Sequence, residues 1–348
     1  MTKKNYSTYV VATADFDFDK KQPEFSASCW MSHLDDDLNL KDLTLPGTRC
    51  SSASASWIND AGDLNVEPVI DDMKLKYRIL EMHKYHKRSI STQLNSGVRL
   101  LDLRCDGSRT LRQGPLTLEK QLDNALDHVK TFLEANKSET VIVMLSFSSA
   151  TAEYDAAKPW SEGYSIKIDD VPGHFNREIK RDMQNDKLLY TGTEWPRLGD
   201  VRGQAVIFRG WGLDSAEDGW ALDCRLPVWE SADGYSSFTK AADLATQRWS
   251  EIVEDFSSQN SLKSIILAAS LNYDPKSDTT WIPPLQTAPI LQKKAEEHIK
   301  QCAKQLKRLW IYGDDMEEKT NMAIAKLNFW GSDDEGVSRP LPVKFITM

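Results

Sequence analysis

Short apolar runs alternate with amphipathic segments through most of this chain, and that alternation restricts its fold more than any other feature. The apolar runs predict strands at 43–45, 98–104, 110–111, 140–146, 205–209, 264–270 and 309–312. Most are continuously apolar, which is typical of parallel strands covered on both faces. The segments between them predict helices at 71–88, 118–135, 175–186, 240–256, 291–307 and 318–327. Repeated strand and helix units imply right-handed crossovers and a parallel sheet.

The number of these units predicts closure into a (β/α)8-type TIM barrel, an α/β fold that we expect to be distorted or incompletely closed. The chain has 348 residues, 40% of them hydrophobic, which is enough for one large core. We therefore expect residues 30–348 to form a single barrel domain. Residues 1–29 contain one short apolar run and then alternate Asp with Phe, a pattern that predicts an N-terminal arm or an edge strand.

Composition and targeting signals argue against several classes of partner. A formal net charge of −9 argues against nucleic acid. No apolar run approaches the length of a transmembrane segment, and nothing in the sequence supports contact with a membrane surface. The first residues lack the apolar core of a secretory signal, and five widely spaced cysteines without a Cys-x-x-Cys pair are typical of a reducing compartment. We expect a cytoplasmic protein without a structural zinc site.

Four motifs follow one another in a fixed order. They are Leu-Pro-Gly-Thr at 45–48, Gly-Val-Arg-Leu-Leu-Asp-Leu-Arg at 97–104, Gln-Gly-Pro-Leu at 113–116 and Leu-Gly-Asp-Val-Arg-Gly at 198–203. Together with Trp-Met-Ser-His at 30–33 and the apolar run at 140–146, they resemble the X-domain of phosphatidylinositol-specific phospholipase C, within the PLC-like phosphodiesterase superfamily. The resemblance covers most of residues 30–320. It implies a TIM barrel with its functional side chains at the C-terminal ends of the strands.

The resemblance also shows which chemistry is missing. It places the family's general base, a histidine, at Arg49, and the histidine that acts as general acid at Gln113. Arginine stays protonated at ordinary pH and glutamine cannot deliver a proton, so neither replaces a histidine. The other positions that differ are Cys50 for an aspartate, Ser146 for a lysine of bacterial members, Gln247 for an aspartate and Trp249 for a tyrosine.

Two arginines of the bacterial, metal-independent members are retained. Arg104 matches the arginine that stabilises the phosphate, where eukaryotic members place an acidic calcium ligand, and a cation there repels calcium. Arg209 matches a substrate-binding arginine. Asp102 lies two residues before Arg104 on the same strand face, where it can orient a neighbour. The resemblance therefore implies that Arg49, Arg104 and Arg209 converge into an anion-binding cluster, with no metal or other cofactor.

Plainer interpretations compete at several of these positions. Arg49 is either an anion ligand or the structural partner of Asp102, because buried arginines are nearly always paired. Cys50 is either a nucleophile whose pKa the arginines lower or a small buried thiol, and the absence of an adjacent histidine favours the thiol. His83 and His86 share a segment rich in Lys and Arg, which predicts a solvated helix surface rather than a metal site.

Asp314 and Asp315 follow the last predicted strand and are the best candidates for a relocated acid or base. His33 is expected to serve packing. The candidate catalytic residues are therefore Arg49, Asp102, Arg104, Gln113 and Asp314. The candidate substrate-binding residues are Cys50, Ser146, Arg209, Trp211, Gln247 and Trp249.

Three functions remain open. The favoured one is a diverged enzyme that binds a small anionic organic molecule, with Trp211 and Trp249 lining the site, and catalyses an elimination, cyclisation or rearrangement. The second is a pseudoenzyme that binds a phosphate or an inositol-phosphate-like ligand without turnover. The third is a phosphodiesterase with a relocated base, for which the candidates are Asp102, His33 and Asp314.

Overall fold

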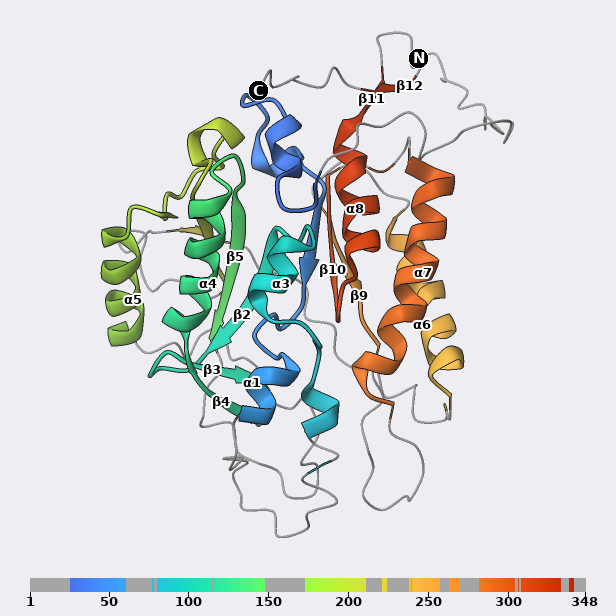
Figure 1. The fold of residues 1–348 in the computed structure, drawn as a ribbon, viewed down its shortest axis with the longest axis horizontal. Helices are drawn as coiled ribbons and strands as arrows, with labels where there is room; N and C mark the ends of the chain where they lie inside the picture. The colour runs from blue at the N-terminus through green and yellow to red at the C-terminus, as the bar shows by residue number, and fades with distance from the viewer. Residues whose placement is uncertain are drawn as a thin grey trace, which may run out of the picture.

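The central feature of the structure is one parallel sheet flanked by helices (Figure 1). The computed structural model describes residues 26–60, 77, 80–113, 116–147, 173–210, 221–223, 238, 240–256, 263–269, 282–303, 306, 308–332 and 338–340. In spatial order the strands of the sheet are β6 (Leu189–Tyr190), β7 (Ala205–Arg209), β5 (Val141–Phe147), β2 (Leu100–Cys105), β1 (Leu45–Thr48), β10 (Leu309–Gly313) and β9 (Lys263–Leu267). Trp211 and the apolar run expected near the N-terminus lie outside the described residues.

Further strands extend this sheet at its edges. They are β8 (Leu222–Asp223), parallel to β7, and the antiparallel hairpin of β3 (Thr110–Gln113) and β4 (Leu116–Gln121), which pairs with the end of β2. A separate antiparallel pair is formed by β11 (Trp330–Ser332) and β12 (Ser338–Pro340). Among the described residues no hydrogen-bonded ladder joins β9 to β6 or β8. Within the described part of the chain the barrel is therefore not closed by hydrogen bonds, in agreement with the expected distorted α/β barrel.

The sheet curves strongly although its edges do not pair. Phe208 on β7 and Trp310 on β10 are four strands apart, a distance of about 19 Å in a flat sheet. Their ring centroids nevertheless lie 5.4 Å apart. One buried cluster joins inward-facing side chains from the curved sheet, among them Leu45, Leu100, Met144, Phe208, Ile266 and Trp310. This cluster is the interior of the barrel.

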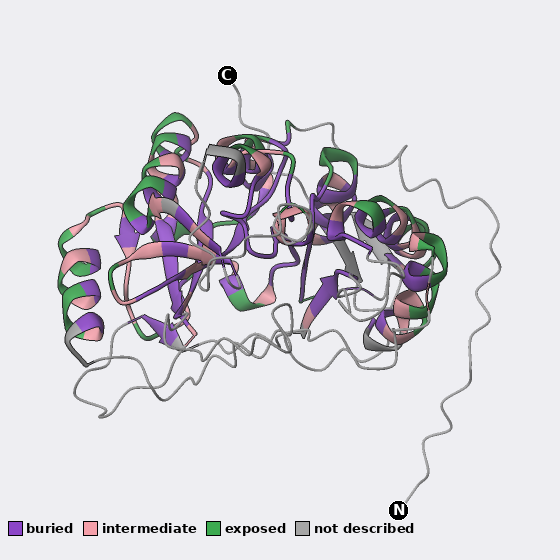
Figure 2. Ribbon diagram, turned by 90° about the horizontal axis from the view of Figure 1, so that it is seen from below, coloured by how far each residue is buried: buried purple, intermediate pink, exposed green. Residues whose placement is uncertain are grey.

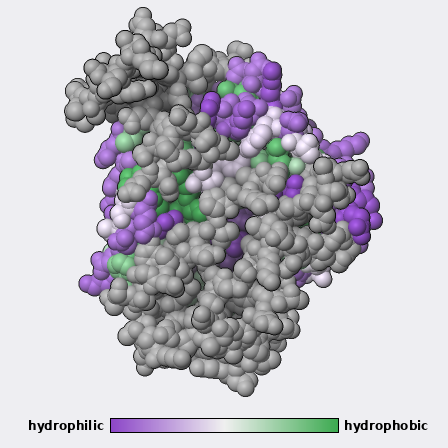
Figure 3. All heavy atoms as spheres, turned by 180° about the vertical axis from the view of Figure 1, so that it is seen from behind, coloured by the Kyte–Doolittle hydropathy of each residue, from purple (hydrophilic) through white to green (hydrophobic). Residues whose placement is uncertain are grey.

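Helices cover the outer face of the sheet, with buried faces turned inward and exposed faces outward (Figure 2). They are α1 (Ala55–Asp60), α3 (Ile90–Asn95), α4 (Leu122–Ala135), α5 (Gly173–Asn185), α6 (Ala241–Asp255), α7 (Pro284–Cys302) and α8 (Glu318–Lys326). The 3-10 helices are η1 (Trp30–His33), η2 (Leu40–Asp42), η3 (Leu198–Val201) and η7 (Leu327–Phe329). From the rear, hydrophilic atoms line the side edges of the molecule (Figure 3). Over the described ranges, no helix has both the length and the apolar content needed to cross a membrane.

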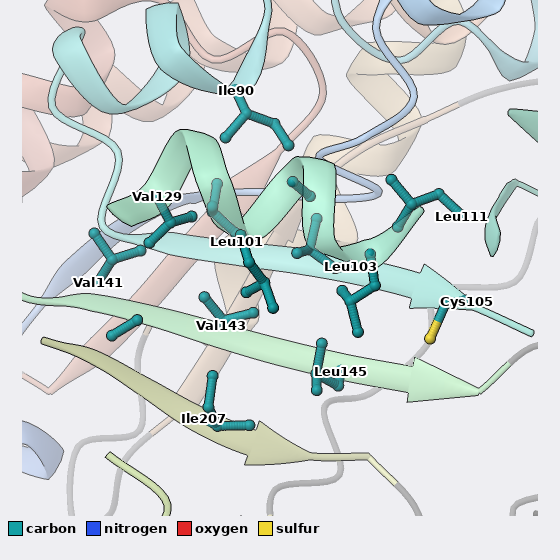
Figure 4. Close-up of a cluster of buried hydrophobic side chains, with 14 of the residues drawn as sticks. Ile90, Leu101, Leu103, Cys105, Leu111, Val129, Val141, Val143, Leu145 and Ile207 are labelled. Atoms are coloured by element: carbon teal, nitrogen blue, oxygen red, sulfur yellow. The ribbon is translucent and has the colours of Figure 1, made fainter. Parts of the chain in front are cut away.

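The outward side chains of the strands pack against α4 (Figure 4). Leu101 and Leu103 of β2 and Val143 of β5 are fully buried in one cluster with Ile207 of β7 and Val129 of α4. Residues on both faces of these strands are thus covered. This explains the continuous apolar runs in the sequence and confirms the parallel arrangement that they predict.

Several predicted boundaries are wrong, each for a local reason. The helix expected from residue 118 begins at Leu122, because Leu116 and Leu118 alternate along the buried face of β4. The helix expected from residue 291 begins at Pro284, since proline is tolerated in the first turn. The expected strand 43–45 shares only Leu45 with β1. Within the described residues the expected helix 71–88 ends at His83.

Candidate functional site

Five polar side chains gather where strands of the sheet end, toward the lower side of Figure 1. They are Arg49 after β1, Asp102 and Arg104 on β2, Ser146 on β5 and Asp314 after β10. Alternation along each strand places them on the same face as the interior cluster that contains Leu45, Leu100, Met144 and Trp310. The ladders align them, because Thr48 pairs with Gly313 and Arg104 pairs with Ser146. Sequence and register therefore bring these predicted site residues together.

Arg49 and Asp314 form a buried ion pair. Nε of Arg49 lies 3.2 Å from Oδ1 of Asp314, and their side chains are 5% and 0% exposed. The backbone N–H of Arg49 donates to the carbonyl of Gly313 at 3.0 Å, which ties the two strand ends together. The guanidinium also stacks on the ring of Tyr85, 4.6 Å from its centroid. The interpretation that Arg49 pairs with Asp102 is wrong, although its premise that a buried arginine is paired is confirmed.

Asp102 instead pairs with Arg104 on its own strand. Nη2 and Nε of Arg104 lie 3.1 and 3.3 Å from Oδ2 of Asp102, as expected for residues two apart on one strand face. Burial is the largest single influence and would lower the pKa of Arg104. The attractions to Asp102 and Cys50, with the hydrogen bond to Asp102, together outweigh burial and raise that pKa, so the guanidinium stays charged. The side chain of Arg104 is 18% exposed, against 5% for Arg49. Arg104 is thus the more accessible of these two cations.

The loop after β1 is held by a network of buried hydrogen bonds. Ser51 N–H donates to the carbonyl of Asp102 (2.8 Å), and Asp102 N–H donates to Oγ of Ser51 (2.9 Å). The hydroxyl of Thr48 donates to Oε1 of Gln93 at 2.8 Å, and Nε2 of Gln93 donates to the carbonyl of Ser51 at 3.0 Å. The serine hydroxyl is thus part of the turn, where Ser and Thr commonly serve.

Cys50 is a small buried thiol. Its side chain is buried, and burial raises the pKa of the Cys50 thiol from 9.0 to about 12, although Arg104 opposes the shift. The interpretation of Cys50 as a nucleophile with a lowered pKa is wrong, because desolvation outweighs the neighbouring arginines.

Alkylation at about pH 8 should therefore spare Cys50 in the folded protein. A pKa raised from 9.0 to about 12 leaves about a thousandfold less thiolate than an ordinary thiol. Peptide mass spectrometry after iodoacetamide treatment should find Cys29, which is partly exposed, modified well before Cys50. Both should react in urea. Equal labelling of the two cysteines without denaturant would contradict the assignment.

His86 is a functional candidate that the sequence interpretation missed. The solvated helix surface predicted for it is wrong, because His86 lies beyond the end of the helix and its side chain is 0% exposed. Burial lowers the pKa of His86 from 6.5 to about 4, which the hydrogen bond to the Arg49 carbonyl and the charge of Asp315 only partly oppose. His86 is therefore neutral at neutral pH. Only a long-range contact reveals it, and no spacing in the sequence marks that contact.

Other predicted residues do not join the cluster. Gln247 and Trp249 lie within α6 in the outer helical layer, where Gln247 is exposed and Trp249 packs against Phe256 and His298. The expectation that these two residues line the substrate site is therefore wrong, whereas the helix expected around them is present. Arg209 is buried at the end of β7, on the face that carries Ala205 and Ile207 and opposite to the face of Arg104. Alternation thus separates Arg209 from the other two arginines.

Gln113 and His33 occupy different ends of the molecule. Gln113 ends β3, beside the C-terminal end of β2, and is buried; within the described part of the chain its Oε1 accepts no hydrogen bond. His33 ends η1, whose Met31 and Ser32 bind Glu139 just before β5 begins. That position is at the opposite end of the sheet, so His33 is wrong as a relocated base. No three potential metal-ligating side chains cluster among the described residues.

Comparisons with known proteins connect this fold to bacterial phospholipases. No family model matches the chain. It is 24% identical to the 1-phosphatidylinositol phosphodiesterase of Staphylococcus aureus (strain Newman) over 216 residues, 61% of this chain and 59% of that protein. It is also 24% identical to the Listeria monocytogenes protein of the same name over 178 residues, 51% of this chain and 47% of the relative. The match therefore spans less than two thirds of either relative.

Solved structures extend the likeness across the fold. Phosphatidylinositol-specific phospholipase C from Listeria monocytogenes superposes with a TM-score of 0.59 and 21% identity, covering 87% of this chain and 99% of that one. A pentafluoro-Phe form of the Staphylococcus aureus enzyme gives a TM-score of 0.58 at 17% identity, covering 86% and 97%. These likenesses support the distorted TIM-barrel fold. Together with the sequence similarity to the two phosphodiesterases, they support the resemblance to the PI-PLC-like superfamily.

Proposed function

We propose that this chain binds a small phosphate-bearing anion at Arg104 and does not cleave phosphodiesters by a histidine acid–base route. One observation carries the proposal: Arg104 is charged and partly exposed, whereas the described groups around it that exchange protons are already committed. The carboxylates of Asp102 and Asp314 each bind an arginine. Both ring nitrogens of His86 are hydrogen-bonded, and burial keeps the Cys50 thiol protonated.

The chemistry of Arg104 favours a phosphate group. A guanidinium presents its donors in a planar fork that matches phosphate oxygens, and a charge-assisted bond of this kind is strong. Ser146 lies opposite Arg104 in the ladder and offers a hydroxyl on the same face. The relatives are named for 1-phosphatidylinositol, so inositol phosphates are the first organic ligands to test.

A diverged enzyme is the second candidate. It is favoured by Asp102 and Asp314, two inward-facing carboxylates beside arginines at the strand ends, which could stabilise charge during a rearrangement of an anionic organic substrate. The tryptophan lining that supported this function from sequence is not provided by Trp249, which lies in α6. We therefore place binding first.

Calorimetric titration with inorganic phosphate and with inositol 1-phosphate tests the proposal. Replacing Arg104 by Met should weaken binding by at least about tenfold, because a charge-assisted bond is lost. Arg104→Lys keeps the charge but loses the planar fork of donors. Its affinity should fall between those of the unmutated protein and Arg104→Met. Arg181→Met on α5 is the matched control, since Arg181 lies on an outer helix and its side chain is 69% exposed. Urea unfolding of each variant should confirm that it is folded.

The same proteins should then be incubated with phosphatidylinositol vesicles and with a metabolite extract, and products followed by mass spectrometry. Intact lipid together with Arg104-dependent binding supports the proposal. Release of inositol phosphate that requires Arg104 would contradict it and point to a phosphodiesterase with a relocated base. Consumption of an extract component by the unmutated protein alone would instead favour the diverged enzyme.

A further inference from the structure

His86 lies where the loop after β1 meets the turn after β10. Two backbone hydrogen bonds join His86 to the loop after β1: His86 N–H donates to Ala53 O (3.2 Å), and Ala55 N–H donates to His86 O (2.7 Å). Nε2 of its ring lies 2.6 Å from the carbonyl oxygen of Arg49, and Nδ1 lies 3.0 Å from the backbone nitrogen of Asp315. A backbone N–H only donates, so Nδ1 carries no proton. The proton is on Nε2, which donates to Arg49.

The carbonyl that His86 holds belongs to a peptide unit with a second contact. The N–H of the same peptide is that of Cys50, and it donates to Oδ2 of Asp102 at 3.0 Å. That oxygen also accepts Nη2 of Arg104 at 3.1 Å. Because a peptide unit is planar and rigid, the imidazole on one side fixes the direction of the N–H on the other. Hydrogen bonds thus run without a break from β10 across β1 to Arg104, and each polarises the next.

The backbone at both ends of this chain of bonds needs support. Cys50 has φ of 48° and Asp315 has φ of 43°, the left-handed region that residues with a side chain rarely adopt. Such conformations persist only where surrounding contacts hold them. The two ring nitrogens of His86 bond directly to the peptides next to these strained residues. His86 is therefore placed to stabilise both conformations at once.

Other side chains hold the turn after β10 but do not replace His86. Nε2 of Gln292 on α7 donates to the carbonyls of Asp314 (3.0 Å) and Asp315 (3.2 Å). The backbone N–H of Lys87 donates to Oδ1 of Asp315 at 2.9 Å. Within the described residues, His86 is the side chain whose hydrogen bonds join this turn to the peptide between Arg49 and Cys50.

We propose that His86 is a positioning residue that sets the orientation of Asp102 and Arg104 through the peptide between Arg49 and Cys50. The inference rests on the proposed function, in which Arg104 contacts the anion. A rotated peptide would withdraw its N–H from Asp102, and the freed carboxylate would redirect the guanidinium. Recognition by a planar fork is directional, so binding would suffer even if the barrel stayed folded.

Acid should break the same chain of bonds. A proton on Nδ1 would turn the acceptor for Asp315 N–H into a donor, so the two groups would repel. The charges that act on the ring are those of Asp315 and Asp102, which favour the protonated form, and that of Arg49, which opposes it; Lys87 in turn pairs with Asp315. Burial has the largest influence on the pKa of His86. The neutral imidazole, which keeps this series of hydrogen bonds intact, therefore predominates above about pH 4.

His86→Leu and His86→Gln form a matched pair for the test. Leucine fills space without hydrogen bonds, whereas a carboxamide offers one donor and one acceptor as neutral imidazole does. His298→Leu is the control, because His298 packs between α6 and α7 against Trp249 and Phe256. The readouts are the affinity for inorganic phosphate near neutral pH and the ¹H–¹⁵N resonances of the Cys50 amide and Arg104 Nε–H, which a role limited to stability would not move.

His86→Leu should shift both resonances and weaken phosphate binding about tenfold, while His86→Gln should stay within about threefold of the unmutated protein. His298→Leu should change neither. Unmoved resonances in His86→Leu would overturn the positioning role. Absence of phosphate binding by the unmutated protein would overturn the proposed function alone, because the resonances still decide the role of His86.

If His86→Leu does not fold, acid titration of the unmutated protein and His86→Gln decides instead. In the unmutated protein the two resonances should move with a midpoint near pH 4, where His86 gains its proton. Glutamine does not titrate, so this step should be missing from His86→Gln. The same step in both proteins would overturn the proposal.

Discussion

Replacing Glu139 by alanine is expected to lower the free energy of unfolding by about 3–5 kcal/mol, because it leaves a buried arginine without its counter-charge. Glu139 lies at the N-terminal end of the barrel, and its Oε2 accepts Nε and Nη2 of Arg99 at 2.9 and 2.8 Å. Both side chains are 0% exposed. Burial already lowers the pKa of Arg99 despite the attraction of Glu139. Without the carboxylate, that guanidinium would lose the attraction that offsets its burial.

The same pair fastens the first described residues to the barrel. Glu139 accepts the backbone N–H groups of Met31 and Ser32, each at 3.2 Å, and Nη2 of Arg99 donates to the carbonyl of Ala27 at 3.0 Å. Alanine at 139 would therefore leave buried backbone donors unsatisfied as well as a buried charge. Glu139→Gln keeps the shape and some of these acceptors, so its effect should be smaller.

Urea unfolding of the three proteins checks this prediction. The matched control is Glu134→Ala, since Glu134 is exposed on α4, a few residues before Glu139. The control should unfold at nearly the same urea concentration as the unmutated protein, because exposed substitutions usually have small effects. Equal midpoints for Glu134→Ala and Glu139→Ala would show that the buried pair contributes no net stability.

Much of the barrel could be predicted from sequence because its strands are covered on both faces. The run 205–209 becomes β7 without any change of boundary, and the run 140–146 becomes β5 shifted by one residue. The hairpin of β3 and β4 is harder to predict from sequence. Leu118 fits the helical spacing that continues through Leu122 and Leu126 as well as it fits a strand. Pairing with β3, a tertiary contact, decides between the two.

The site was predictable only where residues follow strands. Arg49, Asp102 and Asp314 come together because strand ends of a parallel sheet meet at one edge. The prediction that Gln247 and Trp249 bind substrate is wrong because both lie on a helix, α6, whose buried face is set by Leu244 and Ile252.

The prediction that His86 lies on a solvated helix surface is wrong for a different reason. Its partners are backbone atoms of Arg49 and Asp315, and a backbone atom leaves no signature in the residue type. The abundance of Lys and Arg around it indicated a solvated surface, and only the folded chain shows that the imidazole turns inward.

The buried imidazole also makes stability depend on pH. As the pH falls from 6.5 to 4, the titration of His86 by itself is expected to lower the free energy of unfolding by about 3 kcal/mol. The sign follows from the lowered pKa. The unfolded chain takes up a proton as the pH falls below 6.5, whereas the folded chain does so only near pH 4, so protons favour unfolding across this interval. The contribution is complete above pH 6.5 and lost as the pH falls.

Urea unfolding of the unmutated protein and of His86→Gln over this pH range isolates the effect. Carboxylates lower the stability of both proteins in acid, but glutamine does not titrate, so the difference between the two curves belongs to His86. That difference should shrink steadily from pH 6.5 to pH 4 and then level off. Curves that stay parallel would mean that the imidazole is already charged in the folded chain, or that it reaches water. Either case is incompatible with an unprotonated Nδ1 that accepts from Asp315, and would remove the basis for the hydrogen-bonded path from β10 to Arg104.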